Sequence, residues 1–197
     1  MERVNFTKME DGTAEEYAFL DTLEAQYKAA LPTRLIETLR GLSGGLSGYQ
    51  ISRLEHSLQG ATRAHRAGED LELVMATLFH DIGDELAVYS HSEMAAAILR
   101  PFVSEKIYWI IKHHGVFQMY YYAHHCGGDR NTREMFSDSP WYEDAIHFCH
   151  EYDQNCFDPA YKTEPLEFFI PMIESFFSSP KSNDAEELAR YGNRSAE

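Results

Sequence analysis

Basic residues are scarce in this sequence: 17 Lys and Arg stand against 32 Asp and Glu, which gives a formal net charge of -15. Nucleic acids and anionic membrane surfaces bind proteins through clustered Lys and Arg, so neither is expected as a partner. Long apolar runs are also missing, and the opening MERVNFTKMEDGTAEEY lacks the order of a signal peptide. We therefore expect a cytoplasmic protein. Its oligomeric state cannot be read from these features.

Cysteine is also rare. The sequence contains three cysteines, Cys126, Cys149 and Cys156, and no two of them form a CxxC pair. An odd number of cysteines without that spacing argues against a disulfide framework and against a structural zinc site. We expect reduced thiols that pack as small core residues.

Strand-like alternation of apolar and polar residues is hard to find, whereas apolar residues recur every three or four positions along most of the chain. Thr13 and Glu16 have the spacing of a capping box, and Pro32 suits the first turn of a helix. We predict an all-α protein. The expected helices cover residues 15–31, 32–42, 51–67, 71–82, 92–99, 104–122, 140–155 and 165–177.

The length of 197 residues and a hydrophobic content of 44% fit one domain with a sizeable core. We expect residues 1–197 to form this single domain, with a helical extension at its N-terminus and a polar tail that frays from Ser178. The Gly/Ser-rich segment GLSGGLSGYQ, residues 41–50, is expected to be a movable loop.

Several side chains that can bind metal fall within these helical segments. His80 shares an apolar stripe with Leu73 and Thr77, and Asp81 follows it directly. His56 lies nearer to the inward face of its segment than to the solvated one. An unpaired carboxylate at the end of a buried helix is costly, and a divalent cation would neutralise it.

Three further residues extend this set. His91 lies shortly downstream of Asp81, and Asp153 shares an inward stripe with Cys149. Of two adjacent histidines, His114 continues the apolar series and His113 is rotated by about 100°. We choose His114 as the ligand, with His113 as the open alternative.

Each of these residues alone could be a hydrogen-bonded core histidine or a capping aspartate. Together, four histidines and two aspartates on successive helices favour a compact dinuclear site in which Asp81 bridges two ions.

The order of His56, the adjacent His80 and Asp81, and then Asp153 resembles the H…HD…D motif of the HD-domain superfamily. Most members of that superfamily are metal-dependent phosphohydrolases. One branch, with myo-inositol oxygenase and the organophosphonate oxygenases, uses a mixed-valence diiron site. The chain is similar to this branch over about residues 46–160. The similar segments are RLEHSLQ, ATLFHDIGD, YSHSEMAAAIL, HHGVFQMYY and EYDQNCFDP.

The resemblance implies an HD-domain helical bundle with two iron ions, Fe(II) and Fe(III), and O2 as co-substrate. One iron would be held by His56, His80, Asp81 and Asp153. The other would be held by Asp81, His91 and His114. The implied reaction cleaves the C–P bond of a small organophosphonate, a 1-hydroxyphosphonate. The expected substrate is (R)-1-hydroxy-2-(trimethylammonio)ethylphosphonate, and the expected products are glycine betaine and phosphate.

Two other functions stay open. His56, His80, Asp81 and Asp153 alone would serve a phosphohydrolase. Such an enzyme would act on a nucleotide or phosphate ester through a metal-activated water. A non-catalytic module with structural metal ions is the third possibility.

Five more residues surround the expected metal centre. The resemblance implies that Tyr49 occupies an open iron position until substrate displaces it, and that Gln118 stands where related enzymes bind substrate. Arg130 and Arg133 could donate hydrogen bonds to phosphonate oxygens. Asp84, together with aromatic faces, could recognise a trimethylammonium group. The alternative for each is a packed loop aromatic or a solvated side chain.

Overall fold

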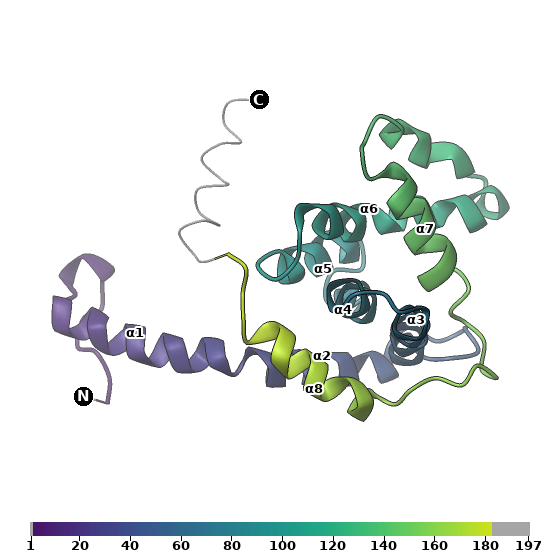
Figure 1. Ribbon diagram of the computed structural model, residues 1–197. Coiled ribbons are helices and arrows are strands. Elements are labelled where there is room, and N and C mark those ends of the chain that lie inside the picture. The colour runs from purple at the N-terminus through teal and green to yellow at the C-terminus, as the bar shows by residue number, and fades with distance from the viewer. Residues whose placement is uncertain (1, 183–197) are drawn as a thin grey trace.

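The computed structural model describes residues 2–182, which contain helices and no strand (Figure 1). The all-α prediction is confirmed, and most helix boundaries lie within a few residues of those expected. The helices are α1 (Ala14–Ala29), α2 (Leu31–Gly41), α3 (Arg53–Ala67), α4 (Leu71–Phe79), α5 (His91–Leu99), α6 (Glu105–Tyr122), α7 (Tyr142–Tyr152) and α8 (Leu166–Phe177). Short 3-10 helices cover Met9–Asp11, Leu42–Gly44, Ala123–Cys126 and Arg130–Phe136.

Polar side chains cap the starts of three helices that carry the site, α3, α4 and α6. Ser52 accepts a hydrogen bond from the Glu55 backbone N–H, and the Glu55 carboxylate accepts one from the Ser52 backbone N–H. This capping box satisfies donors that the first turn of α3 leaves unpaired. Asp70 and Ser104 cap α4 and α6 through their own side chains.

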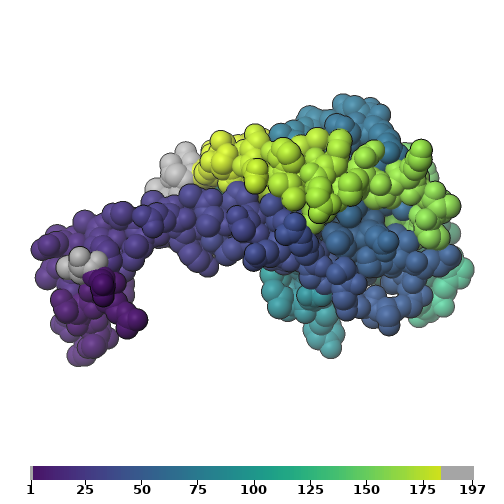
Figure 2. All heavy atoms as spheres, turned by 90° about the horizontal axis from the view of Figure 1, so that it is seen from below, coloured from purple at the N-terminus to yellow at the C-terminus, as the bar shows by residue number. Residues whose placement is uncertain are grey.

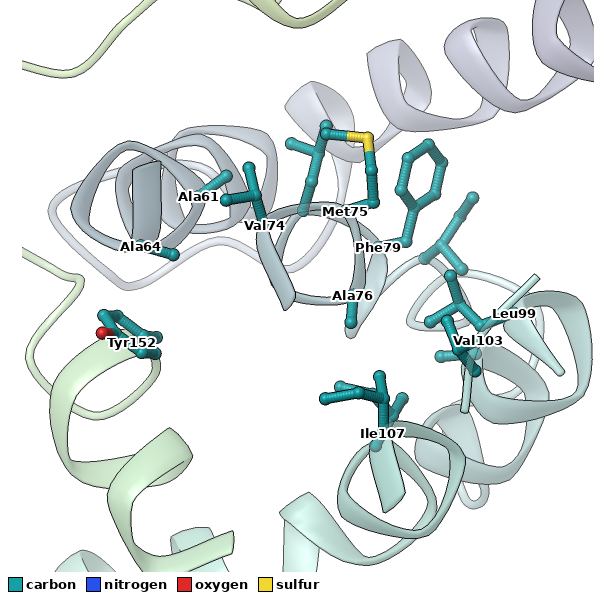
Figure 3. Packing of buried hydrophobic residues seen from close by; sticks show 14 of the residues in the cluster. Ala61, Ala64, Val74, Met75, Ala76, Phe79, Leu99, Val103, Ile107 and Tyr152 are labelled. Carbon is teal, nitrogen blue, oxygen red and sulfur yellow. The ribbon is translucent and has the colours of Figure 1, made fainter. Parts of the chain in front are cut away.

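Helix α4 forms the centre of the core, and α3, α5, α6 and α8 all contact it. Its sequence LELVMATLF is apolar on nearly every side, as expected for a helix surrounded by other helices. Figure 3 shows this packing from close by. Its labelled residues are Val74, Met75, Ala76 and Phe79 of α4, Ala61 and Ala64 of α3, Leu99 of α5, Ile107 of α6, Tyr152 of α7, and Val103.

The helix expected over residues 71–82 is shorter than predicted, because α4 ends at Phe79. His80 is its C-cap, and turns follow as far as residue 86. Gly83 explains the close approach of α5 at this point: a Cβ on Gly83 would lie 2.8 Å from the carbonyl oxygen of His91. The turn therefore brings the start of α5 against the end of α4.

The first helix, α1, forms an arm. Helix α1 extends away from the rest of the molecule in line with α2, while α8 lies along α2 (Figures 1 and 2). Residues 21–30 are all exposed. No residue of α1 belongs to the hydrophobic core.

The beginning of the predicted tail lies against the body. The Lys181 backbone N–H donates a hydrogen bond of 2.7 Å to the carbonyl oxygen of Pro101, and its ammonium group pairs with Glu72. Residues 183–197, the rest of the predicted tail, lie outside the described residues. Within residues 2–182, no helix is both long and apolar enough to cross a bilayer.

The three cysteines are free thiols, as expected. Cys149 and Cys156 are buried core residues. Cys126 is exposed, so the expectation of core packing was wrong for this residue. It lies in the 3-10 helix that follows α6, where the chain turns at the surface.

Candidate metal centre

The six predicted metal ligands come from five parts of the bundle and meet in one place. All are buried except His91, whose side chain is 29% exposed. They are His56 on α3, His80 and Asp81 directly after α4, His91 at the start of α5, His114 on α6, and Asp153 at the end of α7.

Asp81 lies at the centre of this cluster, and its two oxygens face different pairs of histidines. Oδ2 is 3.5 Å from His56 Nε2 and 3.4 Å from His80 Nε2. Oδ1 is 3.5 Å from His91 Nε2 and 3.4 Å from His114 Nε2. A carboxylate with this environment can bridge two metal ions.

Asp153 joins the first of these two halves. Its Oδ1 lies 3.4 Å from His56 Nε2 and 3.8 Å from His80 Nε2. Three sets of ligand atoms lie within 4.8 Å of one another and could each hold an ion. They are His56, His80 and Asp81; His80, His114 and Asp153; and Asp81, His91 and His114. The third set is the second iron site implied by the family resemblance.

Backbone carbonyls orient three of the histidines. The Nδ1 atoms of His80 and His114 lie 2.7 Å and 2.6 Å from the carbonyl oxygens of Thr77 and Ile111. His56 Nδ1 lies 3.0 Å from the carbonyl oxygen of Cys156. A carbonyl can only accept, so each Nδ1 carries the proton and each Nε2 presents a lone pair to the cluster. Metal-binding histidines are commonly held in this way.

Several atoms in the cluster need a cation. The Nε2 atoms of His56 and His80 are 3.2 Å apart, and two lone pairs at that distance repel unless a positive charge lies between them. Asp153 Oδ2 and Gln118 Oε1 are buried without a hydrogen-bond partner. Imidazole nitrogens and carboxylate oxygens suit iron, manganese or zinc. The residues present therefore fit a metal site.

The charges of the cluster agree with this conclusion. Burial raises the pKa of the Asp81 carboxyl, but His80 and His114 outweigh it and hold that pKa well below its usual range. Burial likewise raises the pKa of Asp153, while His56 and His80 bring it below its usual range. For His56 and His80, burial lowers the pKa, but the two carboxylates outweigh it and raise both values. Asp81 and Asp153 are therefore ionised at neutral pH, and buried carboxylates require cationic partners.

Only one of the two adjacent histidines faces the cluster. His114 is 2% exposed and points at Asp81. His113 packs against the rings of Trp109 and Phe136, at centroid distances of 4.7 Å and 4.5 Å. The difference follows from the 100° rotation between neighbouring residues of a helix.

A cavity of about 280 Å³ opens beside the cluster. Tyr49 is 52% exposed and stacks on Phe157, which in turn stacks on His56. Gln118 donates a hydrogen bond of 2.9 Å to Asp153 Oδ1. The cavity is lined by Tyr49, Arg53, Asp81, His91, His114, Gly115, Gln118, Tyr121, Tyr122, Asp153, Gln154 and Phe157.

Three residues expected to bind substrate do not line this cavity. The guanidinium carbons of Arg130 and Arg133 lie 4.0 Å and 3.6 Å from the centre of the Tyr120 ring. They belong to a 3-10 helix that packs against α6. Asp84 lies close to the cluster, but its oxygens face Arg53 and His91.

Arg53 lines the cavity and was not selected from the sequence. Its Nε lies 2.7 Å from Asp84 Oδ2, and its Nη1 lies 3.5 Å from Asp81 Oδ2. Its guanidinium carbon is 5.2 Å from the centre of the Tyr49 ring. The available signal was its position three residues before His56, because residues three apart share a helix face.

Comparison with known proteins agrees with this geometry. Residues 53–147 match the HD domain family, and the match stops before Asp153. Over 84 residues the chain is 31% identical to a protein of Leisingera caerulea named [1-hydroxy-2-(trimethylamino)ethyl]phosphonate dioxygenase (glycine-betaine-forming). That alignment covers 37% of this chain and 43% of the relative, so the chain spans less than half of the relative's length. The helical bundle and the buried His56, His80 and Asp81 agree with the match of residues 53–147 to the HD domain family.

Proposed function

We propose that this protein is an O2-dependent oxygenase with two iron ions that cleaves the C–P bond of a 1-hydroxyphosphonate. The proposed substrate is (R)-1-hydroxy-2-(trimethylammonio)ethylphosphonate, and the products are glycine betaine and phosphate. The observation that carries the proposal is the position of Asp81 between two pairs of histidines. The name of the relative supports the choice of reaction.

Each half of the centre has its own ligands in this proposal. His56, His80 and Asp153 hold one ion, His91 and His114 hold the other, and Asp81 is shared. When bound, the two ions would supply the redox chemistry with O2. The protein side chains bind and orient the substrate beside them.

The cavity walls suit a substrate with an organic cation at one end. A quaternary ammonium group has no N–H to donate, so aromatic faces and negative charge must bind it. Tyr121, Tyr122 and Phe157 provide aromatic lining, and Gln118 holds the nearby Asp153 carboxylate. Tyr49, at the exposed side of the cavity, would cover the site before substrate enters.

A metal-dependent phosphohydrolase is the second candidate. One observation favours it: Asp81 and Asp153 each have an oxygen within 3.8 Å of the Nε2 atoms of both His56 and His80, and these four are the residues of the H…HD…D motif. A hydrolase would need a metal-activated water there, and no O2.

Oxygen dependence separates the two functions. We expect protein produced anaerobically with iron to hold about two irons per chain and to release phosphate from the 1-hydroxyphosphonate only when O2 is supplied. Equal phosphate release with and without O2, or turnover of a phosphate ester in place of the phosphonate, would favour the hydrolase. A protein that stably holds a single zinc ion and turns over neither compound would contradict both.

A further inference from the structure

Arg53 is the only lysine or arginine among the described residues that line the cavity. Its side chain is 17% exposed, and the charges nearest to it are the carboxylates of Asp81 and Asp84. A guanidinium group can pair with both carboxylates and still bind an anion, because it presents several N–H donors in a planar fork. Because the side chain lines the cavity, its donors can meet a ligand there.

The Asp84 carboxylate forms an ion pair with this guanidinium. Its Oδ2 lies 2.7 Å from Arg53 Nε, and its Oδ1 lies 3.7 Å from His91 Nδ1. The carboxylate therefore joins the base of the guanidinium to a metal-site histidine from a different helix. On the side of Asp81, the terminal nitrogen Nη1 lies 3.5 Å from Oδ2.

Among the described residues, no other side chain that lines the cavity is a lysine or arginine. Gln118 has no charge and already donates to Asp153, and Arg130 and Arg133 lie over Tyr120 outside the cavity. An anionic substrate that reaches the metal centre would bring two or more negative oxygens beside Asp81. Guanidinium groups bind such oxygens in pairs.

We propose that Arg53 binds the anionic end of the substrate, a phosphonate or phosphate group, and that Asp84 is the positioning residue that aims its guanidinium. This inference deepens the proposed function and rests on it for the identity of the substrate. The sequence suggested that Asp84 recognises a trimethylammonium group. In this inference Asp84 instead orients the Arg53 side chain.

The test measures binding of inorganic phosphate to metal-loaded protein by calorimetry, with metal content determined for every variant. We expect Arg53→Gln to keep its metal and to weaken phosphate binding by roughly ten- to a hundredfold, the effect of losing a charged hydrogen-bonding partner. Arg53→Lys keeps the charge without the fork and should fall between wild type and Arg53→Gln. Arg66→Gln is the matched control, because Arg66 lies on the same helix and pairs with Glu164 outside the cavity.

Asp84→Asn tests the positioning role. It should weaken phosphate binding by roughly three- to tenfold, and in the Arg53→Gln background it should have little further effect, because the two residues act together. Added guanidinium ions should restore part of the phosphate affinity of Arg53→Ala, which a purely structural role would not allow.

Phosphate affinity equal to wild type in Arg53→Gln, with the metal retained, would overturn the inference. So would a metal-loaded wild type that binds no phosphate. Failure of the proposed oxygenase function is distinguishable, because phosphate binding that depends on Arg53 in a protein that cleaves no C–P bond supports the inference and contradicts only the reaction.

Discussion

Two capping boxes in this chain have the same local chemistry and different surroundings. At the start of α1, Glu16 N donates to Thr13 Oγ1 over 3.3 Å and Thr13 N donates to Glu16 Oε2 over 3.0 Å. At the start of α3, the corresponding bonds between Ser52 and Glu55 are 3.2 Å and 2.7 Å long. The first box begins an exposed arm, and the second begins the helix that carries Arg53 and His56.

The difference shows what local sequence can and cannot determine. Both boxes start a helix, but only α3 is then covered by other helices, with α4 and α7 as its neighbours. Helix α1 has few contacts with other helices and must rely mainly on its own hydrogen bonds, whereas most helices in proteins are stabilised chiefly by packing. The functional centre and the arm should therefore respond differently to equivalent mutations.

The largest contrast is expected for aspartates. Asp81→Ala would remove the carboxylate that the two ions of the proposed centre share. Changes to groups that merely support metal ligands already cost about 10- to 100-fold in metal affinity or activity. We expect Asp81→Ala to exceed that range and to lose metal from both positions. The measurement is metal content after dialysis, together with turnover. Asp21→Ala, at an exposed position of the arm, should change neither, and a loss of metal in that variant would contradict the separation of the two regions.

Glycines provide the second contrast. A Cβ on Gly60 would lie 2.4 Å from the Tyr152 carbonyl oxygen and 2.9 Å from Thr77 Cγ2, so helices α3, α4 and α7 would have to separate. We expect Gly60→Ala to lower the free energy of unfolding by about 1–3 kcal/mol. Urea denaturation would measure it. In the arm, a Cβ on Gly12 would meet only the end of the Tyr17 side chain, which can rotate away. Gly12→Ala should thus cost less than Gly60→Ala, and the reverse order would refute the comparison.

The smallest contrast concerns the caps themselves. Loss of a cap residue typically costs about 1 kcal/mol. We expect Ser52→Ala to reduce global stability by about that amount, because α3 unfolds with the core. Thr13→Ala should leave the midpoint of global unfolding unchanged and speed amide hydrogen exchange in α1 alone. Equal shifts of the unfolding midpoint in both variants would mean that the arm and the core unfold as one unit.

Helical periodicity and cap residues predicted most of this fold. The spacing of apolar residues placed His56, His80, His114 and Asp153 on inward faces, and the structure brings all four together. It could not predict that α4 ends at Phe79, because that end depends on how closely α5 approaches Gly83.

Contacts between distant segments explain the remaining differences. Arg130 and Arg133 are suitable anion-binding residues by composition, but Tyr120 lies beneath both of them. Arg53, at the start of α3, lines the cavity and pairs with Asp84, which belongs to the turn after α4. No pattern of one helix reveals such pairings, whereas the ligand order could be recognised from residue types and spacing.

The carbonyls that orient the histidines also determine the order in which these rings can be aligned while the chain is being synthesised. His80 and His114 take their acceptors from residues three positions earlier, so these two rings can be aligned as soon as their own helices form. The carbonyl that orients His56 belongs to Cys156, 100 residues later in the chain. Asp153 lies in the same late segment. On a ribosome, the α4 and α6 histidines would thus be prepared well before the first motif histidine receives its orienting partner. A chain that ended after His114 and before Asp153 would carry five of the six predicted ligands and still lack the contact that aligns His56.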